Sequence, residues 1–219
     1  MDDDTRADSV FITFEGVEGC GKSTQARLFA ERLTAAGVVV RTLREPGGTQ
    51  VGEAIREILL DPANVLLDPR AELLLYEASR AQLVAEVIKP ALAAGEVVVC
   101  DRFYDSTTAY QGYARGIALD EIGRINEAAT GGLVPDLTIV VDIDPATGLE
   151  RACRASEGAD RLEAEELAFH ERVREGFLAI ARAEPDRMLV VSGEGTAQQV
   201  AERIEHAVRG TGLLSGVLG

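Results

Sequence analysis

The sequence predicts an α/β fold built around a largely parallel sheet. Short apolar runs rich in β-branched residues alternate with longer helix-like stretches over most of the chain. Polar residues do not interrupt these short runs at every second position, which is typical of strands that are covered on both faces. With 219 residues, of which 46% are hydrophobic, the chain can form one domain with a sizeable core.

The predicted elements follow one another along the chain in that alternating order. Strands are expected at residues 10–14, 38–43, 97–100, 137–143 and 188–191. Helices are expected at residues 22–36, 50–60, 70–94, 120–129, 145–153, 161–183 and 196–209. Pro62, Pro69 and Pro90 make the long middle stretch a candidate for a break. A single domain over residues 9–209 is expected between a disordered acidic tail at 1–8 and a flexible tail at 210–219.

Composition excludes several classes of protein. The formal charge of −15 argues against a general nucleic-acid-binding surface. No apolar run approaches the roughly 20 residues of a membrane-spanning helix, and the acidic start is unlike a secretory signal. Cys20, Cys100 and Cys153 lie far apart in the sequence, so neither disulfides nor a structural zinc site are expected. Without disulfides, a cytoplasmic location is expected. His170 and His206 lie in charge-rich helical stretches and are expected to be solvated.

A phosphate-binding loop is the most specific motif. Residues 16–24 fit the pattern G-x-x-x-x-G-K-[ST] between a predicted strand and a predicted helix. Its backbone N–H groups and the helix dipole favour a triphosphate. Lys22 would contact the β- and γ-phosphates, and Ser23 would bind Mg²⁺. The residues expected to bind this triphosphate are Gly16, Val17, Glu18, Gly19, Cys20, Gly21, Lys22, Ser23 and Thr24.

A second metal-binding side chain is expected at the end of the third strand. Asp101 follows four apolar residues, as in a Walker B motif. In a parallel sheet its carboxylate emerges at the same edge as the phosphate loop, where it can hold Mg²⁺ through water.

Arginines dominate the remaining candidates. Arg44, Arg80 and Arg102 lie at strand or helix ends near the expected cleft, and guanidinium groups bind phosphate in a bidentate manner. Residues 148–162 are Gly-, Ala- and Ser-rich and suggest a mobile lid. The lid arginines that would neutralise the transferring phosphoryl group are Arg151, Arg154 and Arg161.

This set of residues favours a phosphate monoester as the acceptor. A monoester is already an anionic nucleophile at pH 7, so it needs positioning and charge neutralisation, not a general base. A guanine-reading lysine motif is missing, which argues against a GTPase. An alcohol acceptor, such as a nucleoside, stays open because Glu15 could act as a base. A nucleotide-binding protein that has lost catalysis is a third reading, opposed by the intact Lys22, Ser23 and Asp101.

Several motifs together resemble the bacterial thymidylate (dTMP) kinase family from about residue 10 to residue 209. They are Phe-Glu15-Gly-Val-Glu18-Gly-Cys-Gly-Lys-Ser-Thr, Arg44-Glu-Pro-Gly-Gly-Thr49, Glu72-Leu-Leu-Leu-Tyr76-Glu-Ala-Ser-Arg80, Asp101-Arg102-Phe-Tyr-Asp-Ser106, Ala109-Tyr110-Gln111-Gly and Asp160-Arg161-Leu-Glu163. The resemblance implies a three-layer αβα nucleotide-kinase fold with five parallel strands. It also implies Mg²⁺-dependent phosphorylation of dTMP to dTDP with ATP, usually by a homodimer.

The resemblance also implies roles for individual residues. Tyr76 would stack on thymine, Thr107 and Gln111 would hydrogen-bond the base, and Arg56 would approach it from the other side. Arg80 and Arg102 would hold the dTMP phosphate. Tyr110 would occupy the space of a 2′-hydroxyl, and Glu15 would lie near the 3′-hydroxyl or the acceptor phosphate. Arg44 and Glu45 would line the pocket beside a cis bond before Pro46. No arginine lies within residues 17–20, so the lid arginines would carry that charge.

A separate hypothesis concerns the thiol in the phosphate loop. The positive charge expected there should lower the pKa of Cys20 and make it reactive.

Overall fold

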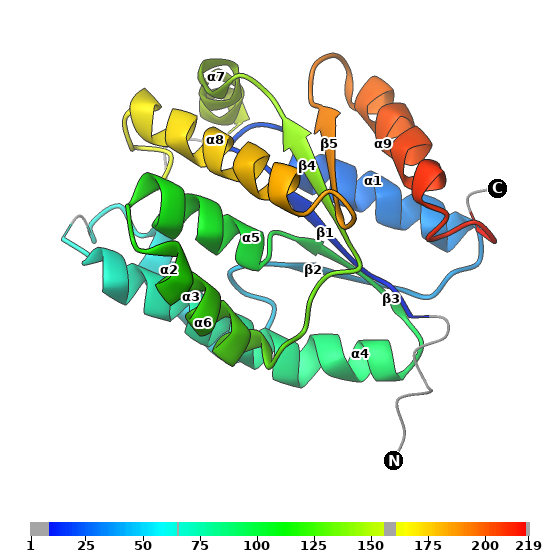
Figure 1. The fold of residues 1–219 in the computed structure, drawn as a ribbon, viewed down its shortest axis with the longest axis horizontal. Coiled ribbons are helices and arrows are strands. Elements are labelled where there is room, and N and C mark those ends of the chain that lie inside the picture. The colour runs from blue at the N-terminus through cyan, green and yellow to red at the C-terminus, as the bar shows by residue number, and fades with distance from the viewer. Residues whose placement is uncertain (1–8, 65, 156–160, 218–219) are drawn as a thin grey trace.

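The computed structural model describes residues 9–64, 66–155 and 161–217. The predicted acidic tail and part of the predicted lid, residues 156–160, lie outside the described residues. Five parallel strands form one sheet in the order β2-β3-β1-β4-β5. The strands are β1 Phe11–Glu15, β2 Val40–Arg44, β3 Val97–Asp101, β4 Leu137–Asp142 and β5 Met188–Ser192. The predicted α/β class and parallel sheet are therefore confirmed (Figure 1).

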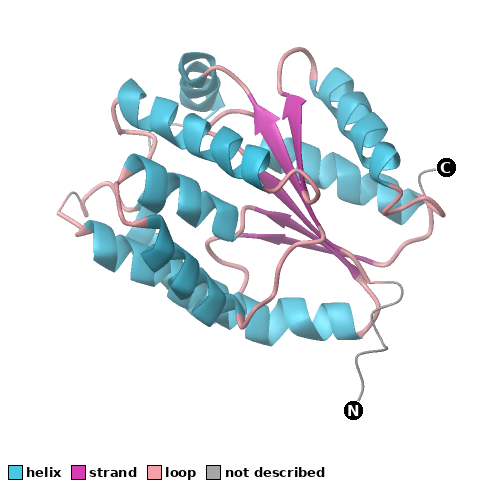
Figure 2. Cartoon of the chain, viewed as in Figure 1, coloured by secondary structure: helices cyan, strands magenta, loops and turns pink. Residues whose placement is uncertain are grey.

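Helices lie on both sides of this sheet (Figure 2). Every residue of β1 is buried, as expected for a central strand covered on both faces. Alternate residues of β1 and β3 face two separate apolar clusters. Ile12 and Phe14 pack with α1 and α9, while Phe11 packs with the helix that precedes β3. The helices are α1 Lys22–Ala35, α2 Gln50–Leu60, α3 Pro69–Leu83, α4 Lys89–Ala93, α5 Tyr104–Thr107, α6 Leu119–Thr130, α7 Pro145–Ala155, α8 Leu167–Ala183 and α9 Ala197–Thr211.

The long middle helix is continuous, but its hydrogen-bond pattern changes near its middle. Between α3 and α4, residues Val84–Ile88 form a π-helical turn, η1, which leads directly into the helical turn that contains Pro90. Proline lacks an N–H group, and a widened turn next to it accommodates that missing donor without ending the helix. The helix starts where expected, because Asp68 caps it through the N–H of Arg70 and Pro69 occupies its first turn.

Three segments differ from the sequence-based expectation. The helix expected over residues 161–183 begins only at Leu167, as α8. Residues 104–114, for which no helix is predicted, form α5 and a π-helical turn η2 at Thr108–Ala114, and α8 runs alongside η2. The chain end is not a loose tail as far as it is described. Helix α9 continues to Thr211, Gly212 caps it in the left-handed conformation, and Leu214 is buried in the core. In the described ranges, no helix is both long and apolar enough to cross a membrane.

Candidate active site

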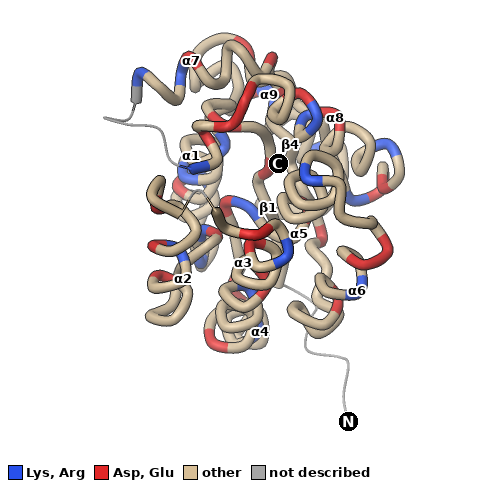
Figure 3. Tube along the Cα trace, turned by 90° about the vertical axis from the view of Figure 1, so that its left-hand side faces the viewer, with Lys and Arg blue, Asp and Glu red and all other residues tan. Residues whose placement is uncertain are grey.

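A cleft of about 600 Å³ opens at the carboxyl edge of the sheet. The loop after β1, the ends of β2 and β3, and helices α3, η2 and α7 all contribute to its wall. Figure 3 looks onto this end of the molecule and shows both basic and acidic residues around it. The lining residues are Glu18, Gly19, Gly21, Lys22, Ser23, Thr24, Arg44, Glu45, Pro46, Arg56, Leu60, Tyr76, Asp101, Arg102, Ser106, Thr107, Tyr110, Gln111, Arg151, Ala152, Leu162 and Glu163.

The phosphate loop forms one end of this cleft. Gly21 adopts a φ of 95°, a left-handed conformation that glycine tolerates, and so lets α1 begin directly at Lys22. The Lys22 side chain is 8% exposed, and its Nζ donates to the carbonyl oxygen of Val17 at 3.2 Å. Ser23 and Thr24 line the cleft beside it. A strand, a glycine-rich loop and a helix N-terminus thus place amide groups and one ammonium group around a space suited to phosphates.

Asp101 ends β3 and lines the same cleft. Its Oδ1 is buried and has no hydrogen-bond partner among the described residues. A buried carboxylate oxygen without a donor is costly unless a cation or water satisfies it. Carboxylate and hydroxyl oxygens are the ligands that Mg²⁺ prefers, and Ser23 supplies a hydroxyl in the same cleft. The residues present therefore fit a magnesium ion.

Arg102 connects the phosphate loop to the segment after β3. Its Nη1 donates to the carbonyl of Gly16 at 3.3 Å and to Oγ of Ser106 at 2.9 Å. Its Nη2 donates to Oε1 of Glu18 at 2.7 Å and to the Tyr110 hydroxyl at 3.1 Å. The backbone at Arg102 has a φ of 71°, an unusual conformation for a non-glycine residue and one that clusters at functional sites. The guanidinium thereby lies at the cleft next to the phosphate loop.

Glu18 has a larger role than its place in the loop motif indicates. Besides Arg102, the Tyr110 hydroxyl contacts both carboxylate oxygens, at 2.7 and 2.6 Å, and Nδ1 of His170 lies 3.4 Å from Oε2. Burial alone would raise the pKa of Glu18, but the charges of Arg102 and Lys22 and the hydrogen bond from Tyr110 hold it well below its usual range. An ionised carboxylate therefore faces the cleft.

The position of His170 corrects a sequence-based expectation. The residue is 0% exposed rather than solvated, and neither ring nitrogen makes a hydrogen bond within the described part of the chain. Its ring packs edge-on against Phe169 in the core face of α8. The apolar periodicity of α8, read together with Phe169, Val173 and Phe177, is the signal that could have placed it inward.

The end of β2 and the loop after it form the opposite wall. The peptide bond between Glu45 and Pro46 is cis, as the family resemblance implied. Arg44 pairs with Glu53 at 2.9 Å, and Nη1 of Arg56 donates to the carbonyl of Pro46 at 2.9 Å. Burial, reinforced by Glu77, raises the pKa of Glu45 to about 7, although Arg80 opposes this shift.

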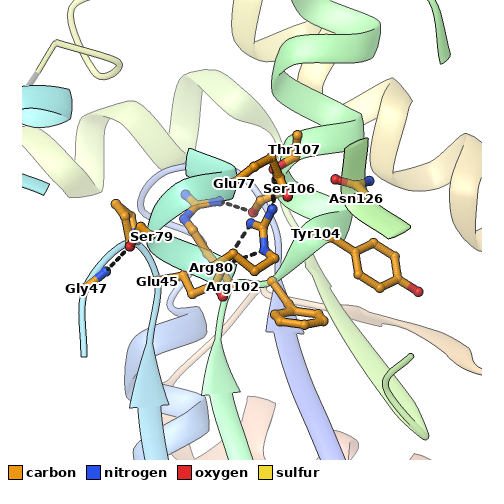
Figure 4. Close-up of polar contacts among 12 residues, drawn as sticks. Glu45, Gly47, Glu77, Ser79, Arg80, Arg102, Tyr104, Ser106, Thr107 and Asn126 are labelled. Atoms are coloured by element: carbon orange, nitrogen blue, oxygen red, sulfur yellow. Dashed lines mark hydrogen bonds and ion pairs between the residues drawn. The ribbon is translucent and has the colours of Figure 1, made fainter. Parts of the chain in front are cut away.

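Arg80, which is predicted to hold the dTMP phosphate, lies behind the residues that line the cleft. Its side chain is 1% exposed and pairs with Glu45 at 2.7 Å and with Glu77. Nη1 also donates to Oγ1 of Thr107 at 2.9 Å. Figure 4 shows Arg80 surrounded by these carboxylates. Arg80 therefore holds Glu45 and Thr107, both of which line the cleft, in fixed positions.

Glu15, which is predicted to lie near the 3′-hydroxyl or the acceptor phosphate, is buried at the end of β1. It is 0% exposed and does not line the cleft. Its oxygens accept from the backbone N–H of Phe103 at 2.7 Å and from Oγ of Ser106 at 2.6 Å. Burial raises the pKa of Glu15 to about 8, with a further rise from Asp105. Glu15 thus fixes the loop that carries Arg102 to the end of β1.

This raised pKa predicts a pH-dependent loss of stability that Glu15→Gln should remove. The folded-state pKa of about 8 exceeds the ordinary value of 4.5, so stability from Glu15 is full below 4.5 and is lost as pH rises toward 8. Relative to Glu15→Gln, the wild type should lose up to about 1.4 kcal/mol of unfolding free energy per pH unit in that window. Urea unfolding at pH 5 to 8 measures this, with exposed Glu57→Gln as the control. A wild-type-to-variant difference that stays constant with pH would contradict it.

The predicted lid arginines do not lie together. Arg151 lines the cleft, and its Nη1 donates to the carbonyl of Gly193 at 3.1 Å. Arg154 is exposed and pairs with Glu150 on α7. Arg161 turns away from the cleft and pairs with buried Glu72 at 2.6 Å. Of these three arginines, Arg151 is the one that lines the cleft.

The predicted base-binding residues do come together. Tyr76 of α3 and Thr107, Tyr110 and Gln111 of α5 and η2 line one side of the cleft. Tyr76 is half-buried against the core, as both a packing and a stacking residue would be. Their neighbour Ser106 also lines the cleft and was not predicted as a site residue.

The hypothesis of a reactive Cys20 is wrong. The thiol is buried, and burial raises its pKa more than Lys22 lowers it. Gly16, Val17 and Cys20 belong to the phosphate loop but do not line the cleft.

Comparisons with known proteins agree with this geometry. A model of the family described as thymidylate kinase matches residues 14–204. The chain is 52% identical over 204 residues to a thymidylate kinase of Geobacter sp. (strain M21), with 91% of each chain covered. It is 52% identical over 199 residues to a thymidylate kinase of Deinococcus radiodurans, covering 91% of this chain and 96% of that one.

A solved structure supports the same assignment. The crystal structure of thymidylate kinase from Ehrlichia chaffeensis superposes with a TM-score of 0.76 at 35% identity, covering 91% of this chain and 98% of that chain. The resemblance drawn from the motifs is thereby confirmed over most of the sequence. The cleft, the parallel sheet and these matches lead to one conclusion: the chain belongs to the thymidylate kinase family.

Proposed function

We propose that the chain transfers the γ-phosphoryl group of ATP directly and in line to the phosphate of dTMP, giving dTDP and ADP. Phosphorylation of dTMP with ATP follows from membership of the family. The observation that supports direct transfer is that Lys22 and Arg102 line one continuous cleft. A triphosphate bound at Lys22 and a monophosphate bound at Arg102 can therefore lie next to each other, so no covalent intermediate on the protein is needed.

The donor end is assigned to the phosphate loop. Its amides and Lys22 would surround the β- and γ-phosphates, and Arg151 would add charge from α7. Mg²⁺ would be held by Ser23 and Asp101, where it neutralises phosphate charge. These groups stabilise the negative charge that the transferring phosphoryl group carries.

The acceptor end is assigned to the opposite part of the cleft. Arg102 would bind the dTMP phosphate, and Tyr76 would stack on the base. Thr107 and Gln111 would hydrogen-bond the base, with Arg56 on its other side, while Tyr110 would occupy the space that a 2′-hydroxyl needs. Arg44 and Glu45 would complete the wall, which Arg80 holds from behind.

An alcohol acceptor is disfavoured by the positions of the carboxylates. Glu15, the candidate base, does not reach the cleft. Glu18 does, but its low pKa makes it a poor proton acceptor. Glu45 also lines the cleft and has a pKa of about 7, but its Oε2 pairs with Arg80. A coupled ADP-release assay tests this. We expect turnover of dTMP well above that of dUMP, UMP or AMP, and none of thymidine. Equal rates with AMP would contradict the base assignment, and turnover of thymidine would contradict the acceptor assignment.

We also propose that the chain acts as a homodimer in the cytoplasm. Helix α3 packs between α2 and α6, and each of these helices exposes large apolar side chains. They are Val51 and Ile58 of α2, Leu74 of α3 and Leu119 of α6. Apolar side chains gathered on adjacent helices favour contact with another protein surface, and a second copy is the partner the family resemblance implies.

Leu74→Asp is therefore expected to convert the dimer to a monomer. Leu74 is 58% exposed on α3, so a charge there should not disturb the fold but should disfavour burial between two copies. Light scattering coupled to size exclusion measures the molar mass. Leu167→Asp, at the exposed start of α8, is the matched control. A Leu74→Asp protein with the dimer mass would place the interface elsewhere.

A further inference from the structure

A fully buried carboxylate lies behind the base-binding wall. Glu72 of α3 is 0% exposed and does not line the cleft. It nevertheless contacts three side chains from other segments of the chain: Gln111 of η2, Arg115 just after η2, and Arg161 before α8. Burying a charged carboxylate costs free energy unless it is well paired. This many partners therefore indicate that Glu72 serves the fold or positions a neighbouring side chain.

One oxygen of Glu72 fixes the orientation of the Gln111 amide. Nε2 of Gln111 donates to Oε1 of Glu72 at 2.6 Å, and Gln111 is 1% exposed. An ionised carboxylate only accepts hydrogen bonds, so the NH₂ end of the amide must face Glu72. The carbonyl oxygen Oε1 of Gln111 lies at the other end of the amide. Because Gln111 lines the cleft, that acceptor is the end offered to a ligand there.

The second oxygen holds the carboxylate in place. Nη1 of Arg161 lies 2.6 Å from Oε2 of Glu72, and Nη2 of Arg115 lies 3.3 Å from it. Arg161 is itself fixed, since its Nε donates to the carbonyl of Leu59 at 2.9 Å. Two guanidinium groups therefore pair with this oxygen. Because the arginines hold Glu72 in place, its hydrogen bond keeps the Gln111 amide in one orientation.

Other residues in this set of contacts are next in sequence to residues that line the cleft. Leu60 follows Leu59, and Leu162 follows Arg161, and both of these neighbours line the cleft. Glu72 therefore sits at the point where α2, α3, η2 and the segment before α8 meet behind the base site.

We propose that Glu72 is a positioning residue that sets the choice of pyrimidine base by holding the Gln111 carbonyl toward the cleft. Thymine carries a hydrogen on N3, which a carbonyl oxygen accepts, whereas N3 of cytosine is itself an acceptor. Two acceptors facing each other leave a buried group unsatisfied, which disfavours cytosine. This inference rests on the proposed contact between Gln111 and the base.

Glu72→Gln provides a test with a directional outcome. The new side chain has one carbonyl oxygen, and Arg161 and Arg115 compete for it, so its NH₂ group turns toward Gln111. Gln111 must then rotate its carbonyl toward residue 72 and offer its NH₂ group to the cleft. The ratio of kcat/KM for dTMP to that for dCMP should fall at least about tenfold, with KM for dTMP rising more than kcat falls.

Glu165→Gln is the matched control. Glu165 pairs with Nη1 of Arg115 at 2.7 Å in the same network but does not contact Gln111. Its ratio should stay at the wild-type value. If Glu72→Gln lowers kcat/KM for both nucleotides equally, Glu72 serves only the fold and the inference is overturned. A wild type that does not phosphorylate dTMP would instead contradict the proposed function itself.

A second variant keeps the inference testable if Glu72→Gln does not fold. Gln111→Leu leaves Glu72 with both arginines and removes the amide that it positions. The dTMP-to-dCMP ratio should again fall about tenfold or more. An unchanged ratio would show that the amide does not read the base, and Glu72 could not then set the choice.

Discussion

Replacing Lys22 with methionine is expected to reduce kcat for dTMP phosphorylation at least about a thousandfold, with little loss of fold stability. Methionine keeps much of the length and the apolar stem of lysine but removes the ammonium group. In the protein that group donates a hydrogen bond to the carbonyl of Val17 and is otherwise positioned at the phosphate end of the cleft. Its charge therefore matters most when phosphate charge is being transferred, which is an effect on the transition state.

The chain offers a closely matched control for this experiment. Lys89 is the other lysine of the sequence, and it lies exposed at the start of α4, away from the cleft. Lys89→Met makes the same chemical change and should leave kcat within about twofold of the wild type. The coupled assay at saturating ATP and dTMP gives kcat, and thermal unfolding gives stability. A Lys22→Met enzyme that kept a tenth of wild-type kcat would contradict the assigned role.

The parts of the site that could be predicted are those whose signals are local in sequence. The phosphate loop needs only nine consecutive residues, and Asp101 needs only the apolar strand before it. Both motifs directly follow a strand. Because β1 and β3 are parallel neighbours, the phosphate loop and Asp101 lie at the same edge of the sheet. Lys22, Ser23 and Asp101 consequently line the cleft as expected.

The arginines could not be assigned in the same way. Placement of Arg80 and Arg161 near the cleft followed from their segments, but each guanidinium pairs with a buried carboxylate instead of facing the cleft. Arg161 and its partner Glu72 lie far apart in the chain, so no local pattern predicts their contact. The orientation of a long charged side chain depends on the charges packed around it. Those neighbours come from distant parts of the sequence and are known only from the folded structure.

The segment after β3 was missed for a related reason. Residues 104–114 contain threonine, tyrosine and glycine, which favour helix weakly, and tertiary contacts with α8 stabilise the helical turns there. The same packing turns His170 inward against Glu18. Intrinsic preference therefore predicts too little helix in the segment that carries most of the residues proposed to bind the base.

Arg102→Met is expected to have two separable effects, one on stability and one on activity. Losing the guanidinium leaves Glu18 buried with Tyr110 and His170 but without its closest cation, which should lower the free energy of unfolding by about 3 kcal/mol. Losing the phosphate contact should reduce kcat/KM for dTMP by at least about a hundredfold. Urea unfolding and the coupled assay measure the two effects, with exposed Arg124→Met as the control for charge.

The double variant Arg102→Met, Glu18→Gln separates these effects. The glutamine introduced in place of Glu18 carries no charge, and the Tyr110 hydroxyl can still donate to its carbonyl oxygen, so most of the lost stability should return. Activity should not return, because neither change restores a cation for the dTMP phosphate. If dTMP turnover recovers together with stability, then Arg102 serves only to neutralise Glu18, and the monophosphate must be held by another part of the cleft.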